Sequence, residues 1–290
     1  MKKILLLITL IIFVFSSGGM VLAQTAPDYK IYSDENTEAI NRVGHKILKA
    51  NNLPEDITFH FSEEDHVNAY ANIDKEVYVY KGLMKLIEKE DELAGVIGHE
   101  IGHICNKHIE KQTLFGAAIS GISALTSKIL NAPVISKIAD GLGVLSMLKV
   151  SRSAEYEADL TGADLMINAG YDPKGMLSLL NKISQNYIDI IQTHPSGDKR
   201  LTNLYDYIAY NYPDKVQDSY PTESYKKFEV FINGVIAERQ ADPKKMADYE
   251  KKQAKLREER IKRAERIEKG STGWDAAFNV LFSSQSDDNL

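Results

Sequence analysis

His99-Glu100-Ile101-Gly102-His103 is the most informative stretch of this 290-residue sequence. We expect it to lie within one α-helix, because apolar residues recur at helical spacing from about Asp91 to Gln112. Histidines four residues apart project from the same face of a helix, so both imidazoles can bind one metal ion. Glu100 is rotated from His99 by about 100°, and from there it can hold a water and accept its proton. The stretch therefore predicts a catalytic metal site.

A catalytic zinc ion needs a third protein ligand, and HExxH proteins supply it in two arrangements. One has a third histidine close behind, in the pattern HExxHxxGxxH. It is not present, because Asn106 stands where that pattern has glycine. His108 drifts off the ligand face of a continuous helix, so we do not expect it to touch the metal.

The second arrangement takes a carboxylate from a later helix. Glu155 and Asp159 are four residues apart and share a helix face. One of them can bind the metal while the other accepts an N–H from a ligand histidine. Glu157 is rotated by about 200° from Glu155 and should point elsewhere. The spacing leaves open which of Glu155 and Asp159 is the ligand.

Three motifs follow one another along the chain: HEIGH at 99–103, SRSAEYEAD at 151–159 and HPSGDKR at 194–200. In this order they resemble the zinc metallopeptidase family that includes the CAAX prenyl proteases, HtpX and the protease-chaperone BepA. The resemblance covers about residues 36–210. It implies a gluzincin, a zinc peptidase whose third ligand is a glutamate, with one Zn²⁺ per chain. The roles it implies are metal ligands His99, His103 and Glu155, general base Glu100, and Asp159 as a partner of a ligand histidine.

The same resemblance assigns roles to three more parts of the sequence. His194 is expected to reach the open position of the metal or the oxyanion, and Arg200 to contact the substrate or the transition state. The stretch Asn68-Ala69-Tyr70-Ala71 looks like the edge strand of that family. A substrate in extended conformation would add to the sheet there.

Around the HExxH helix the pattern predicts an α+β fold that is mainly helical and gluzincin-like. Three short segments are rich in alternating, β-prone residues, and we expect them to form a small antiparallel sheet. They are 57–61, 68–72 and 76–81.

The two ends of the sequence differ in character from its middle. Residues 1–23 begin with two lysines, continue as an uncharged apolar run and end in small residues, a pattern typical of a secretory signal peptide. An uncleaved membrane anchor is the alternative. We expect a metallopeptidase domain over 24–240, followed over 241–290 by a charged C-terminal helix and a disordered tail.

Residues 114–150 are apolar and rich in glycine, alanine and serine. Charged residues interrupt the segment, so we expect a helical hairpin that packs in the core rather than membrane-spanning helices. Contact with a membrane surface is a further possibility for it. The net charge of −6 and the mixed signs of the late charged residues do not indicate a nucleic-acid partner.

These features together predict an exported zinc metalloendopeptidase, periplasmic or extracellular. Its expected substrates are polypeptides, above all unfolded or misassembled envelope proteins, in a role of protein quality control. The main alternative is an envelope chaperone or adaptor with the same fold, in which His194 closes the proteolytic site. A purely structural lipid-surface protein, which would need no metal, is a third hypothesis.

Overall fold

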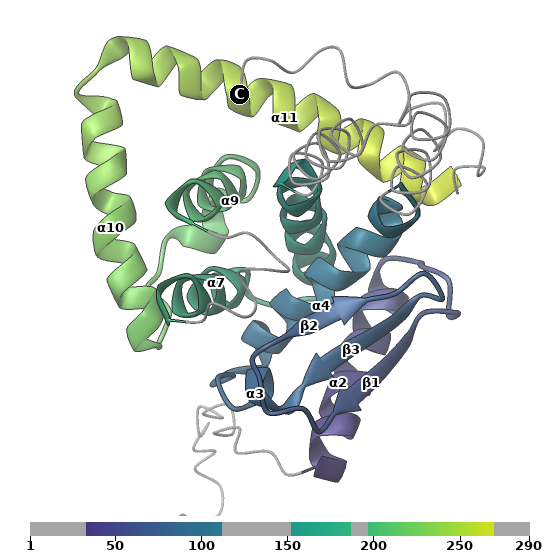
Figure 1. Cartoon of the computed structure of the whole chain (residues 1–290). Helices are drawn as coiled ribbons and strands as arrows, with labels where there is room; N and C mark the ends of the chain where they lie inside the picture. Colours follow the sequence, from purple (N-terminus) through teal and green to yellow (C-terminus); the bar gives the residue numbers. More distant parts are fainter. Residues whose placement is uncertain (1–32, 112–151, 187–196, 270–290) are drawn as a thin grey trace, which may run out of the picture.

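The computed structural model describes residues 33–111, 152–186 and 197–269. This part of the chain is an α+β fold that is mainly helical, with a three-stranded sheet on one side (Figure 1), so the predicted fold class is confirmed. The elements are α2 (Ser33–Ala50), β1 (Thr58–Ser62), β2 (Ala69–Ala71), β3 (Glu76–Tyr80), α3 (Lys81–Met84), α4 (Glu90–Cys105), a helix over 152–168, α7 (Lys174–Asn186), α9 (Asp198–Asn211), the 3₁₀-helix η1 (Pro213–Val216), α10 (Glu223–Gln240) and α11 (Pro243–Lys269).

The sheet is mixed, which corrects the prediction that it is antiparallel. Its strand order is β1-β3-β2; β2 and β3 pair as an antiparallel hairpin, whereas β1 pairs with β3 in parallel. The hairpin closes through a turn in which Lys75 adopts a φ of 63°. The alternating pattern shows which face of a strand is buried, but not which strand lies in the middle. The order could therefore not be read from these short segments.

The sheet, α2 and α4 enclose the main hydrophobic core. Val77 and Val79 of the central strand are fully buried, and the tyrosines beside them are partly exposed, as expected for a sheet with one covered face. Apolar residues of α2 and α4 at helical spacing complete this core. They are Ile40, Val43 and Ile47 on α2, and Leu93, Ile97 and Ile101 on α4.

The α4 helix ends at Cys105 and does not continue to Gln112 as predicted. Asn106 and Lys107 form a turn, with Lys107 at a φ of 56°, and a new helical turn covers 108–111. A lysine in this left-handed conformation has no sequence signature, because glycine is the residue that normally indicates it. The break turns the chain after the HExxH motif in a new direction.

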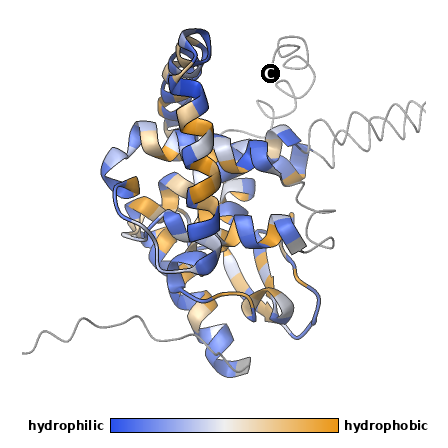
Figure 2. Cartoon of the chain, turned by 90° about the vertical axis from the view of Figure 1, so that its left-hand side faces the viewer, coloured by the Kyte–Doolittle hydropathy of each residue, from blue (hydrophilic) through white to orange (hydrophobic). Residues whose placement is uncertain are grey.

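The last two helices, α10 and α11, pack against the outside of the other helices. The α10 helix runs along α7, and α11 crosses above α9 and the 152–168 helix (Figure 1). Figure 2 shows that α11 is mostly hydrophilic, in contrast to the apolar interior. Within the described residues, no helix has the length and apolar character needed to cross a lipid bilayer. The predicted signal peptide, the 114–150 hairpin and the tail after residue 269 lie outside the described residues.

Candidate metal centre

Three possible metal ligands meet between α4 and the 152–168 helix. The Nε2 atoms of His99 and His103 are 3.0 Å apart. Glu155 turns one carboxylate oxygen to each of them: its Oε2 lies 3.3 Å from His99 Nε2, and its Oε1 lies 3.3 Å from His103 Nε2. Donor atoms around tetrahedral zinc, at bonds of about 2.0–2.1 Å, are separated by about 3.3 Å. The three side chains are buried, and they are the group with metal-binding geometry among the described residues. This donor set therefore fits a zinc ion.

Small residues allow the two helices to approach closely enough for Glu155 to reach the histidines. A Cβ atom at Gly102 would lie 2.7 Å from the carbonyl oxygen of Ala158, and one at Gly98 would lie 2.9 Å from that of Gly162. A Cβ at Gly162 would in turn meet the backbone of Gly98 at 2.8 Å. A larger residue at these points would push the 152–168 helix away from α4.

The structure gives different surroundings to the two carboxylates that the spacing left equivalent. Asp159 Oδ1 lies 2.9 Å from His99 Nδ1, the nitrogen that faces away from the other two ligands. Glu155 lies at the Nε2 atoms of both histidines. Glu155 is thus placed to bind a metal, and Asp159 to orient His99 by accepting its second N–H.

Arg200, at the start of α9, fills the remaining side of the cluster. Its Nε and Nη2 atoms donate to the two oxygens of Asp159 at 2.5 and 2.7 Å, and its Nη1 lies 2.8 Å from Glu155. The arginine is only 6% exposed. Contact of Arg200 with a substrate or transition state stays a prediction; the residue is one of those that line the apolar pocket beside the cluster.

The negative charge of this cluster affects the two histidines differently. Burial disfavours the charged form of His99, but its hydrogen bonds with Asp159 and Glu155 outweigh burial and raise its pKa to about 9. Burial dominates at His103 and lowers its pKa to about 4. The carboxylates therefore attract positive charge to this point, which a divalent metal ion can supply.

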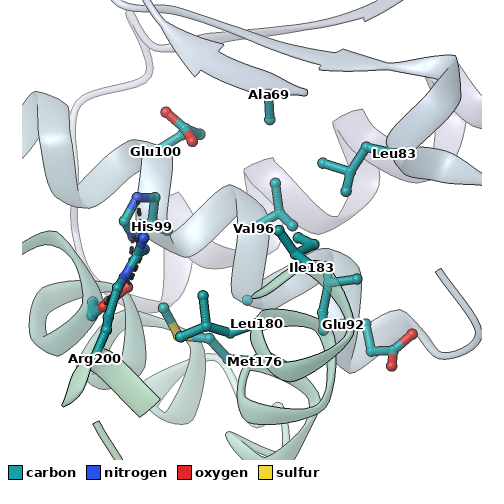
Figure 3. A pocket seen from close by; sticks show the side chains of 13 residues that line it. Ala69, Leu83, Glu92, Val96, His99, Glu100, Met176, Leu180, Ile183 and Arg200 are labelled. Atoms are coloured by element: carbon teal, nitrogen blue, oxygen red, sulfur yellow. Dashed lines mark hydrogen bonds and ion pairs between the residues drawn. The ribbon is translucent and has the colours of Figure 1, made fainter. Parts of the chain in front are cut away.

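An apolar pocket opens beside Glu100, with a volume of about 510 Å³ that includes the space at its mouth. In Figure 3, Glu100 and His99 lie on one side of it, and Ala69 of β2 lies above Val96 of α4. The other apolar walls come from α3 and α7, which the sequence did not indicate as parts of a site. They are Leu83, Met176, Leu179, Leu180 and Ile183.

The predicted edge strand lies next to this pocket. Residues Ala69–Ala71 form β2, an outer strand of the sheet, and Asn68 just before it accepts a hydrogen bond from the amide of Tyr80. Ala69 lines the pocket. The strand is confirmed, whereas its use for substrate binding stays a prediction.

Sequence reasoning missed the surroundings of His103. His108 Nδ1 lies 3.0 Å from His103 Nδ1, and His108 Nε2 lies 3.2 Å from a carboxylate oxygen of Glu157. A continuous helix would have kept His108 away, and only the break at Lys107 brings it back. His194 lies outside the described residues.

Comparison with known proteins places most of this chain in one group. The profile of peptidase family M48 matches residues 34–208. A beta-barrel assembly-enhancing protease of Yersinia pestis is 28% identical over 60% of the chain and 39% of the relative. Metalloprotease LoiP of Escherichia coli (strain K12) is 27% identical over 63% of the chain and 73% of the relative, and mitochondrial metalloendopeptidase OMA1 of Arabidopsis thaliana is 32% identical over 47% and 28%.

The matched region thus spans about two fifths of the length of the assembly-enhancing proteases. The region that the family profile covers includes the HExxH helix, the 152–168 helix and the start of α9. The α10 and α11 helices follow the part of the chain that the family profile covers.

Proposed function

Because this chain belongs to peptidase family M48, a family of metallopeptidases, we propose that it is a zinc-dependent endopeptidase. Its proposed ligands are His99, His103 and Glu155, and Glu100 is its general base. The observation that carries the proposal is the convergence of three buried side chains: the two Nε2 atoms are 3.0 Å apart, and each lies 3.3 Å from an oxygen of Glu155. Two imidazoles and a carboxylate suit zinc, and one coordination position would remain for chemistry.

A bound zinc ion would supply an activated water and a Lewis acid for the scissile carbonyl. Glu100 stands one residue from His99 at the wall of the pocket, where it can accept a proton from the attacking water. It can then pass that proton to the nitrogen of the leaving amine, so that the new carboxyl group receives the hydroxide of the water and the amine receives its proton. Asp159 keeps His99 oriented, and the Arg200 guanidinium places a positive charge beside the cluster.

The pocket and β2 support an extended polypeptide as the substrate. A chain that pairs with β2 would pass Glu100 and could place an apolar side chain between Val96 and Leu180. We propose that the enzyme is exported and acts on unfolded or misassembled envelope proteins. The signal-peptide pattern at 1–23 and relatives such as the beta-barrel assembly-enhancing proteases support this assignment.

Glu100→Gln is the variant that tests the proposal. We expect it to bind one zinc ion as the wild type does and to lose cleavage of an unfolded protein such as casein by at least about 100-fold, because the general base is missing. Zinc is counted by elemental mass spectrometry, and cleavage is followed on gels. Glu250→Gln, an exposed change on α11, is the matched control. Full activity in Glu100→Gln would remove Glu100 as the base, and a wild type that takes up no zinc would contradict the whole proposal.

The same variant separates the enzyme from the chaperone alternative. If Glu100→Gln rescues misassembled envelope proteins in cells as well as the wild type does, binding and not cleavage is the function. Loss of rescue together with cleavage supports the peptidase.

A further inference from the structure

His108 is more deeply buried than either of the proposed histidine ligands, with 4% of its surface exposed against 6% for His99 and 7% for His103. It lies between two groups: the His103 imidazole, 3.0 Å from its Nδ1, and the Glu157 carboxylate, 3.2 Å from its Nε2. The proposed function assigns no task to either His108 or Glu157. A carboxylate, a histidine and a ligand histidine therefore form one line of hydrogen bonds that ends at the metal cluster.

The protons of this line can be placed by elimination. Nε2 of His103 faces His99 and Glu155. With the proposed metal bound to the lone pair of Nε2, Nδ1 carries the proton. His108 Nδ1 then has to accept that proton, which leaves the proton of His108 on Nε2. From there it is donated to Glu157, which as a carboxylate can only accept. Each member of the line thus fixes the tautomer of the next.

We propose that His108 and Glu157 are positioning residues for His103, which hold its ring in the tautomer and orientation that metal binding requires. This inference rests on the proposed zinc site. His99 has a direct carboxylate partner in Asp159, whereas His103 reaches its carboxylate through a second imidazole. Partners of this kind raise the basicity of a ligand and limit the motion of its ring.

Two features of the fold supply this arrangement. The break at Asn106 and Lys107 turns the chain so that His108 comes back against His103. Glu157 projects from the 152–168 helix at about 200° from Glu155, and the Arg266 guanidinium of α11 holds its second oxygen at 2.8 Å. Helix α11 lies beyond the region that the family profile covers, so this chain anchors the line with a segment outside that region.

The test compares two substitutions of His108. Asn can place an amide oxygen near the position of Nδ1 and still accept from His103, whereas Leu fills the space and accepts nothing. We expect His108→Leu to weaken zinc binding by about 10- to 100-fold, and His108→Asn to keep most of the affinity. Zinc affinity is measured by competition with a chelator, and Co²⁺ bound in place of zinc reports ligand geometry by its visible spectrum. Glu157→Gln should change affinity less than His108→Leu, because its amide oxygen can still accept.

His60→Leu on β1 is the control, because His60 stacks on Tyr78 and lies on the strand at the opposite edge of the sheet from β2. The melting temperature of each metal-free variant reports whether the fold is intact. If His108→Leu binds zinc as tightly as the wild type, the inference is wrong and the peptidase proposal stands. It is also wrong if both His108 variants lose affinity and melting temperature equally, since His108 would then act only in packing. A wild type without zinc would overturn the proposed function itself.

Discussion

At the scale of single residues, Arg200 is the buried cation on which two carboxylates depend. It binds both oxygens of Asp159 and one of Glu155. We expect Arg200→Ala to lower the free energy of unfolding of the metal-free protein by about 3–5 kcal/mol, because Asp159 and Glu155 stay buried without the guanidinium that pairs with both. Saturating zinc should reduce this loss, since the dication replaces the missing positive charge.

Urea unfolding in EDTA and in excess zinc measures both effects of Arg200→Ala. Arg257→Ala, an exposed change on α11, is expected to leave both values unchanged. An equal loss with and without zinc would mean that Arg200 contributes packing alone.

Ionisation of Asp91, in the first turn of α4, destabilises the folded state. Burial and the nearby Asp172 carboxylate raise its pKa above 3.8, although the Asp172 amide and the Tyr220 hydroxyl donate to it. Because the folded-state pKa is the higher one, the wild type gains stability as pH falls through it toward 3.8. We therefore expect Asp91→Asn to be more stable than the wild type at pH 7. This difference in the free energy of unfolding should shrink as pH falls from the folded-state pKa of Asp91 toward 3.8. Thermal unfolding across pH measures the difference, and a constant difference would contradict the prediction.

At the scale of elements, the contact between α4 and the 152–168 helix decides whether the ligands meet. A methyl group at Gly102 or Gly162 would lie within 2.9 Å of the opposite backbone. We expect Gly102→Ala and Gly162→Ala each to cost about 1–3 kcal/mol of stability through overpacking. Both should also weaken zinc binding, because the helix that carries Glu155 moves outward.

Gly234→Ala is the matched control for these glycines. Gly234 lies inside α10, and a Cβ there would meet nothing within 4 Å. In that position alanine should stabilise the protein by about 0.5–1 kcal/mol, since it favours a helix more than glycine does. Calorimetry and zinc competition compare the three variants. Normal zinc affinity in Gly102→Ala would show that the close approach is not needed for the site.

Particular residues show what the sequence can and cannot predict at these two scales. The shared helix face of His99 and His103 follows from their spacing of four. The same rule puts Glu155 and Asp159 on one face of the 152–168 helix, but it does not tell which of the two carboxylates faces Nε2 of the histidines. The position of β3 in the middle of the sheet does not, because pairing depends on contacts between strands. The left-handed Lys107 has no signature either, and it alone brings His108 to His103.

At the scale of the whole molecule, α11 joins the body through charged groups. Asp164 on the 152–168 helix accepts hydrogen bonds from Arg260 and Arg263 of α11, and from Tyr207 and Tyr212. Arg263 is only 4% exposed. The sequence predicted a charged helix here but not its attachment, because these pairs link residues about a hundred positions apart and leave no local pattern. Figure 1 shows the result, a long helix held across the top of the body.

We expect Asp164→Asn to loosen α11 while the metal ligands stay in place. The change removes the charge that balances two guanidinium groups, one of them buried, and should cost about 3–5 kcal/mol. Limited trypsin digestion should then cleave within 243–269 faster than in the wild type, while zinc content is unchanged. Asp248→Asn, exposed on the same helix, is the control. Equal cleavage rates in the two variants would contradict the role of Asp164 as the attachment point.

The attachment of α11 has a consequence for the order in which the molecule is built during translation. The proposed ligands His99, His103 and Glu155 are all made before residue 160, but Arg266, which holds Glu157, emerges from the ribosome more than a hundred residues later. The outer anchor of the metal site is therefore its last part to be synthesised. A nascent chain that already contains every proposed ligand still lacks Arg266, which holds the Glu157 carboxylate at the far end of the hydrogen bonds that run from His103 through His108.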